Sequence, residues 1–176
     1  NNLPLVTGNA VSRFASANNE FTGHFDVNVG WHKWAVLFSA SHNNFSDLKM
    51  GSNGPNDYLR TFYVTRQNNT DIMVLNPDKL VQASSGYSQD NLMAKVLFQP
   101  SSVWDITYAL HYSTTSDIDR YDRLIRTKND LPRSAEWYYG PQKWMMNNIT
   151  IHNIANNDLF DEFTVRLASQ LFEESR

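Results

Sequence analysis

Residues 20–29 read EFTGHFDVNV, and this stretch decides the fold because apolar and polar side chains alternate through it. One set of alternate positions is mostly apolar, namely Phe21, Gly23, Phe25, Val27 and Val29. The positions between them are polar, namely Glu20, Thr22, His24, Asp26 and Asn28. Successive side chains of a strand point to opposite faces. The stretch therefore predicts a strand with one apolar face and one polar face.

The same alternation extends outward in both directions along the chain. It predicts seven strands, at residues 9–16, 20–29, 33–43, 87–99, 104–115, 137–152 and 159–174. They are about 8–16 residues long, whereas a tilted strand needs about 9–11 to cross a bilayer and most globular strands have about 5–6. Residues 58–66 look strand-like but alternate poorly, and we expect mostly loop from there to residue 85.

The connections between these strands alternate in length. Short turns are expected around Trp31, Pro100 and Asn156, and long loops around Gly54 and Arg120. Transmembrane barrels have short turns on the periplasmic side and long loops outside. We therefore expect the three turns at the inner end of the sheet and the two loops at the outer end.

Aromatic residues mark the ends of the predicted strands. Trp31 and Trp34 flank one short turn, and Phe98 and Trp104 flank another. Rings with a polar edge settle at the membrane–water interface, and they form girdles around outer-membrane barrels. This placement favours a transmembrane barrel. A soluble β-sandwich that binds, for example, carbohydrate stays open as the alternative, because strands with one wet face also occur there.

Composition excludes several other classes. The 176 residues contain no cysteine, so the chain has no disulfide or thiolate metal site, and no apolar run reaches the roughly 18 residues of a transmembrane helix. A net charge of −3 argues against a nucleic-acid partner. The chain lacks a signal peptide and begins at Asn1, so we expect a processed product or a fragment.

Motifs for catalysis are absent from the sequence. It contains no phosphate-binding loop, nucleophile elbow or zinc-protease helix, so we predict no enzyme and no cofactor. The five histidines, at 24, 32, 42, 111 and 152, are scattered, and bonds to neighbouring side chains are expected for them rather than a zinc site. Asp117, Asp119 and Asp122 would suit calcium. They lack the glycine and the distal glutamate of a calcium loop, however, so we favour charge pairing with arginines 120, 123 and 126 in the same loop.

A group of rings follows this arginine-rich loop. The candidate ligand-binding residues are Arg120, Arg123, Trp137, Tyr138 and Tyr139. The rings would stack on a planar ligand, and the arginines would attract an anionic one. The other interpretation is an aromatic girdle with loop packing.

Several longer stretches resemble TonB-dependent outer-membrane receptors. They are SANNEFTGHFDVNVG (16–30), DLKMG (47–51), GYSQDNLMAKV (86–96), RYDRLI (120–125), SAEWYYGPQKWMM (134–146) and FEESR (172–176). The resemblance implies a plug domain, a 22-stranded barrel in the bacterial outer membrane, and uptake of a scarce nutrient such as an iron-siderophore or haem. The implied partners are membrane lipid, the nutrient, and the TonB system through the plug.

On this resemblance, residues 1–176 would form about the first seven strands of such a barrel, without the plug. The predicted fold is an all-β, antiparallel up-and-down meander. Seven strands cannot close a barrel, since the smallest bacterial members have eight. We therefore expect an open, curved sheet whose free edges lie near Asn9 and Leu159.

Overall fold

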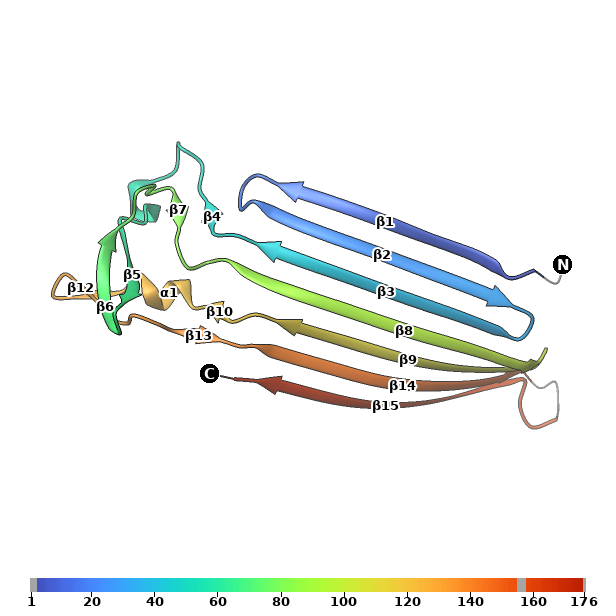
Figure 1. Ribbon diagram of the computed structural model, residues 1–176. Helices are drawn as coiled ribbons and strands as arrows, with labels where there is room; N and C mark the ends of the chain where they lie inside the picture. The colour runs from blue at the N-terminus through green and yellow to red at the C-terminus, as the bar shows by residue number, and fades with distance from the viewer. Residues whose placement is uncertain (1–2, 155–157, 176) are drawn as a thin grey trace.

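The main feature of the computed structural model, which describes residues 3–154 and 158–175, is one seven-stranded antiparallel sheet (Figure 1). Its strands follow one another in sequence order, so the fold is an all-β meander. They are β1 (Leu5–Ala15), β2 (Glu20–Trp31), β3 (Trp34–Phe45), β8 (Tyr87–Ser101), β9 (Trp104–Thr115), β14 (Gln142–Ile154) and β15 (Glu162–Glu174).

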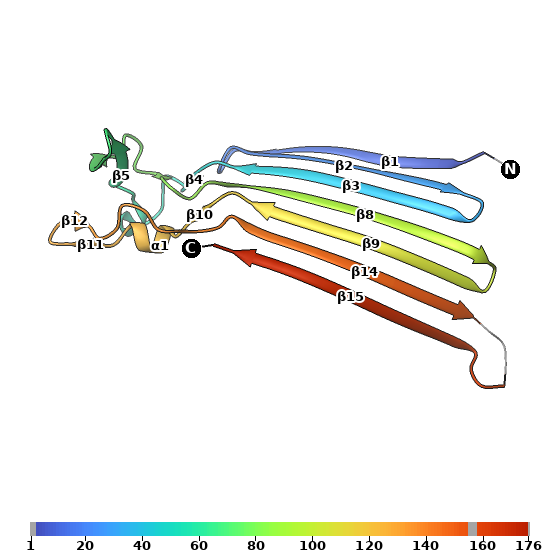
Figure 2. The same cartoon turned by 60° about the horizontal axis from the view of Figure 1, so that its bottom comes forward.

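The remaining elements are short and gather beyond one end of the sheet (Figures 1 and 2). The two long connections, between β3 and β8 and between β9 and β14, supply all of them. They are β4 (Leu48–Lys49), η1 (Asn56–Tyr58), β5 (Phe62–Gln67), β6 (Thr70–Leu75), β7 (Val81–Gln82), β10 (Ile118–Asp119), α1 (Tyr121–Leu124), β11 (Thr127–Lys128), β12 (Leu131–Pro132) and β13 (Tyr138–Tyr139). We call this assembly, residues 46–86 and 116–141, the loop cluster.

The opposite end of the sheet carries short turns. His32 and Lys33 join β2 to β3, and Ser102 and Val103 join β8 to β9. The prediction that long loops and these short turns lie at opposite ends is confirmed. Asn156, the centre of the third predicted turn, lies outside the described residues.

The pairing register sorts the side chains into two faces. Phe25 lies opposite Ala40, which lies opposite Leu92, and the row continues through Tyr112 and Met145 to Leu171. The next row along the strands contains Asp26, Ser39, Met93, His111, Met146 and Gln170. A slip of one residue would move a strand's apolar set to the polar side. The aligned register therefore gives the whole sheet an apolar face and a polar face.

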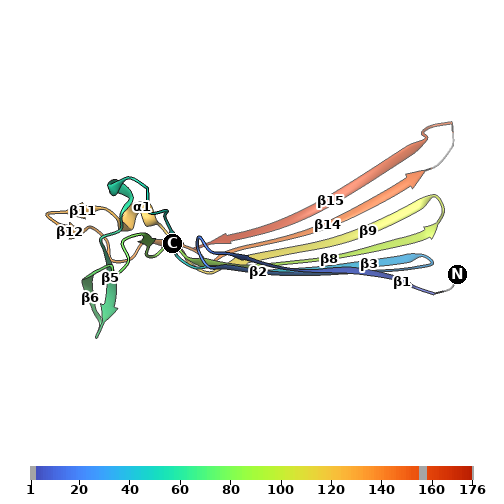
Figure 3. The same ribbon diagram turned by 90° about the horizontal axis from the view of Figure 1, so that it is seen from above.

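No second layer covers the apolar face within the described residues. The sheet is a single curved layer (Figure 3), and the only buried apolar side chains described are Ala109 and Leu124. Phe25 and Leu171, both on the apolar face, are 47% and 63% exposed. An exposed apolar surface of this extent marks a surface that contacts something other than water.

The two outermost strands each pair on one side only. β1 pairs with β2 and β15 pairs with β14, and within the described residues neither has a second neighbour. The sheet is open rather than closed into a barrel. The expected meander with the first and last strands at its edges is confirmed.

Two predicted boundaries at the turn end of the sheet were wrong. The first strand begins at Leu5 rather than Asn9, because its pairing with β2 continues to Gly30. β8 does not turn at Pro100, because an irregularity between Phe98 and Ser101 carries it further and moves the turn to residues 102–103. Such bulges absorb extra residues without breaking the ladder.

The strand-like residues 58–66 do contain most of β5, but the sequence analysis missed β6 in the stretch that was expected to be mostly loop. β5 and β6 pair as a hairpin with six residues in each strand. Asn68 and Asn69 join them with φ angles of 46° and 64°. Two asparagines accommodate the positive φ angles of a tight hairpin turn, so this signal was present in the sequence.

Candidate ligand site in the loop cluster

Asp47 holds together the two ends of the first long connection, where it leaves β3 and returns to β8. Its carboxylate Oδ1 accepts hydrogen bonds from the backbone N–H groups of Ser85 and Gly86, at 2.7 and 2.9 Å. A Cβ atom at Gly86 would lie 2.8 Å from the carbonyl oxygen of Phe45. Only glycine lets the two strands leave the sheet this close together.

Arg120, one of the predicted site residues, is fully engaged within the protein. Its Nε and Nη2 donate to the two carboxylate oxygens of Asp122 at 2.8 and 3.0 Å, and Nη1 donates to the Tyr139 hydroxyl at 2.9 Å. The hydrogen bonds between them raise the pKa of Arg120 and lower the pKa of Asp122. The Arg120 charge is therefore already neutralised by a forked carboxylate.

Arg123 and Trp137 form a second internal pair. The guanidinium carbon lies 5.5 Å from the centre of the Trp137 ring, and Nε lies 3.5 Å from an oxygen of Asp122. Both distances suit a cation–π contact supported by a charge pair. Asp122 therefore serves both arginines, as the charge-pairing interpretation of this loop predicted.

The predicted ring triplet does not begin a long strand. Tyr138 and Tyr139 form β13, which pairs with β10 in the loop cluster, and β14 begins only at Gln142. Between them Gly140 has a φ of +120°, and a Cβ there would lie 3.0 Å from the Ser116 carbonyl oxygen. The start at residue 137 was wrong because this backbone bend interrupts the strand.

The structure thus brings four of the five predicted residues into two contacting pairs, and Tyr138 lies beside them, 39% exposed. That they bind a ligand stays a prediction. The contacts fit the loop-packing interpretation, because both arginine charges are met by Asp122.

A different arginine, which sequence reasoning missed, is the buried one. Arg60 is 4% exposed, and its Nη1 and Nη2 both donate to the carbonyl oxygen of Leu124 at 3.3 Å. Its guanidinium carbon lies 5.2 Å from the centre of the Phe62 ring and 5.5 Å from that of Tyr121. Within the described residues no carboxylate lies within ion-pair distance of Arg60. Burial lowers the pKa of Arg60, partly offset by Tyr121.

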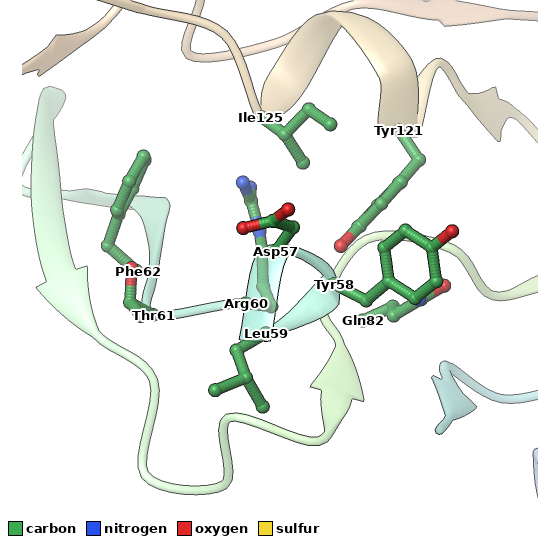
Figure 4. A pocket seen from close by; sticks show the side chains of 9 residues that line it. All are labelled: Asp57, Tyr58, Leu59, Arg60, Thr61, Phe62, Gln82, Tyr121 and Ile125. Atoms are coloured by element: carbon green, nitrogen blue, oxygen red, sulfur yellow. The ribbon is translucent and has the colours of Figure 1, made fainter. Parts of the chain in front are cut away.

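Arg60 lines a pocket of about 220 Å³. Figure 4 shows its guanidinium in the middle of the lining side chains, between Phe62 and Tyr121. The full lining is Asp57, Tyr58, Leu59, Arg60, Thr61, Phe62, Gln82, Tyr121 and Ile125. The local sequence did not single out Arg60, because its carbonyl partner Leu124 and the Tyr121 ring come from the other long connection.

Acidic side chains gather elsewhere in the loop cluster. Burial raises the pKa of Asp119, and the neighbouring carboxylates of Asp47, Asp117 and Glu136 raise it further.

The five histidines do not form a cluster. Three of them (24, 111 and 152) lie on the polar face, His42 contacts Asp90 at 2.7 Å, and His32 lies in a turn. Among the described residues no group of three His, Cys, Asp or Glu side chains could hold a metal ion.

Comparison of the chain with protein-family models, with curated proteins and with solved structures finds no match in any of the three. No helix in the described part of the chain is long and apolar enough to span a membrane.

Proposed function

We propose that the seven-stranded sheet is part of the wall of a transmembrane β-barrel in the bacterial outer membrane. The observation that carries this proposal is the uncovered apolar face, which lies back to back with a polar face in a single layer. A barrel wall needs this arrangement, because one side meets lipid and the other meets the water-filled interior.

The height of the apolar face fits a bilayer. On β2, alternate residues from Phe21 to Trp31 are apolar or glycine and lie on the same face. At about 3.4 Å per residue this stretch is about 34 Å long. A strand tilt of about 40° reduces it to about 26 Å, near the roughly 25 Å apolar band of outer-membrane barrels.

Rings lie at the turn end of the apolar face. Trp34 stacks on Phe98 with ring centres 4.3 Å apart, and Trp104 meets Phe163 edge-on at 5.6 Å. This position is where an interfacial aromatic girdle would lie.

The polar face is a network of side-chain hydrogen bonds. Asn9 donates to Asp26 at 3.2 Å, and the Ser113 hydroxyl donates to Asn91 at 2.8 Å. Trp144 Nε1 donates to Gln170 at 3.2 Å. These groups suit a wetted interior and would be costly in contact with hydrocarbon.

The open edges support the view that the sheet belongs to a larger barrel. In lipid every backbone N–H and C=O group needs a partner, so the free sides of β1 and β15 require further strands. We propose a large barrel of the 22-stranded type, on the resemblance of residues 16–30 and 134–146 to TonB-dependent receptors. The function proposed with it is energy-coupled uptake of a scarce nutrient, such as an iron-siderophore or haem.

The test is uptake by a strain that lacks the whole gene. Loss of TonB-dependent uptake of one labelled iron-siderophore or haem, restored by the gene on a plasmid, is the expected result. Unchanged uptake of every such compound, in a strain without redundant receptors, would refute the transport role.

Fractionation separates the barrel from the soluble β-sandwich alternative. We expect the full-length protein in the outer-membrane fraction and its release only by detergent, because the apolar face needs an apolar solvent. Release into buffer without detergent would instead favour a sandwich whose second sheet covers that face.

A further inference from the structure

We infer that the Arg60 pocket binds a small oxyanion, a carboxylate or phosphate group that is either free or the anionic end of a larger ligand. The inference rests on the proposed function, since it gives the chemical class of ligand that the loop cluster would recognise. Three observations support it: the buried charge of Arg60, its unused hydrogen-bond donors and the size of the pocket beside it.

The first argument is charge. A buried charge is costly unless it is paired, and arginine does not release its proton in proteins. The Leu124 carbonyl oxygen and two ring faces offer Arg60 only partial negative charge. Arg120, in the same loop cluster, is instead met by both carboxylate oxygens of Asp122. Arg60 is therefore a buried cation for which the described part of the chain supplies no carboxylate counter-ion.

The second argument is the supply of donors. A guanidinium has five N–H groups, and the two bonds to Leu124 use one on Nη1 and one on Nη2. Nε is buried and has no hydrogen-bond partner among residues 3–154 and 158–175. Three of the five N–H groups, that of Nε among them, thus lack an acceptor in the described part of the chain, and the edge formed by Nε and an Nη nitrogen matches two oxygens of a carboxylate or phosphate. Solvent does not reach Nε in this structure, so a ligand would bond to it only if the pocket widens around this edge. Phe62 and Tyr121 flank the guanidinium and fix its position.

The third argument is size. A volume of about 220 Å³ is below the roughly 300–1,000 Å³ of pockets that enclose drug-sized ligands. It suits one small charged group, with the Gln82 amide and the Thr61 hydroxyl among the lining residues as further polar partners. Asp57 is the one carboxylate among the lining residues, and it lies beyond ion-pair distance of Arg60. The negative charge of Asp57 should repel a bound anion and weaken its binding, but Asp57 lies too far from Arg60 to act as its counter-ion.

The experiment is calorimetric titration of the full-length protein in detergent, at constant ionic strength, with acetate and with inorganic phosphate. Acetamide, the neutral isostere of acetate, is the control ligand. We expect acetate or phosphate to bind and acetamide not to bind. Stronger binding of acetate would assign a carboxylate group to the pocket, and stronger binding of phosphate a phosphate group.

Three variants test the role of the guanidinium. We expect Arg60→Gln to weaken anion binding at least tenfold, and Arg60→Lys, which keeps the charge but not the fork, to weaken it severalfold. Asp57→Asn should tighten binding about twofold, because it removes a like charge from the pocket. If Arg60→Gln does not fold, the comparison of Arg60→Lys with Asp57→Asn still tests the proposal.

Wild-type binding of either anion no tighter than that of acetamide would overturn the inference, as would equal affinities in wild type and Arg60→Lys. Loss of binding in Asp57→Asn would also overturn it. These outcomes leave the proposed transport role untouched, because uptake and membrane fractionation test that role independently. Conversely, a soluble protein that binds acetate through Arg60 would refute the barrel and keep the anion site.

Discussion

The sheet and the loop cluster are held together in different ways. The sheet consists of strands of 11–15 residues whose backbone pairing is almost uninterrupted, and its side chains are sorted by face. The loop cluster contains mainly two-residue strand pairs and a four-residue helix, joined by side-chain contacts such as those of Asp47 and Arg60.

The two regions also differ in how they place apolar and charged side chains. Among the described residues of the sheet, Ala109 is the one buried apolar side chain, and the larger side chains of the apolar face are exposed or half-buried. The loop cluster pairs its charges, Lys49 with Asp78 at 2.7 Å and Arg120 with Asp122, as a region in water does. On the proposed barrel, lipid would meet the apolar face of the sheet and water would surround the loop cluster.

The largest expected difference between the two ends is in chemical accessibility. Single cysteines replacing Ser52 or Thr127, both in the loop cluster, should react with a membrane-impermeant thiol reagent in intact cells, because long barrel loops face outward. A cysteine at Ser101, beside the short turn, should react only after the cells are permeabilised. Residues 1–176 contain no other cysteine that would react. Labelling at Ser101 alone in intact cells would invert the orientation.

The next largest effect should separate the two faces of the sheet. Phe38→Arg places a charge on the apolar face and should lower the free energy of unfolding in lipid vesicles by about 2–4 kcal/mol, the cost of arginine at the bilayer midplane. Ser39→Arg is the matched control. It places the same charge on the polar face opposite Asp26, and we expect a change within about 0.5 kcal/mol. Equal penalties at the two positions, measured by urea unfolding, would contradict the assignment of faces.

The smallest effect concerns the acidic part of the loop cluster. Burial and neighbouring carboxylates raise the pKa of Asp119 above its ordinary value of 3.8. The folded state therefore holds this proton more tightly than the unfolded state, and the ionised carboxylate opposes folding once pH rises above the folded-state pKa. Asp119→Asn should stabilise the β10–β13 pair at pH 7 by roughly 0.5 kcal/mol, a size typical of partly exposed charges, and leave it unchanged at pH 3.

Hydrogen exchange of the Arg120 amide, which donates to the Trp137 carbonyl beside this pair, measures that change. Asp161→Asn, at an exposed carboxylate next to β15, is the control and should leave the amide unaffected. Faster exchange in Asp119→Asn at pH 7 would show that the carboxylate stabilises the pair instead.

Much of the sheet could be predicted from single strands. The residues assigned to the apolar side, among them Phe25, Val36, Leu110 and Val165, do share one face. The sequence could not place the bulge that takes β8 past Pro100. The alternation of side chains along one strand does not show which residues pair with the neighbouring strand, and a bulge is a change in that pairing. It also did not separate Trp137 from the strand that follows it, since only the bend at Gly140 makes that distinction.

The candidate site could be predicted only in part. The sequence pointed to Arg120 and Arg123 because they lie near each other and near the rings of residues 137–139. It gave no reason to choose Arg60, whose carbonyl partner Leu124 lies 64 residues away on the other long connection.

The sequence by itself determined two faces and an order of strands, because side-chain alternation is a local property with a fixed period of two. Tertiary structure decided the common register of seven strands, the open edges, and which arginine is buried without a carboxylate. These depend on contacts between distant segments that have no periodic pattern of their own. Neither the spacing nor the chemistry of Arg60 reveals its burial until the two long connections are folded against each other.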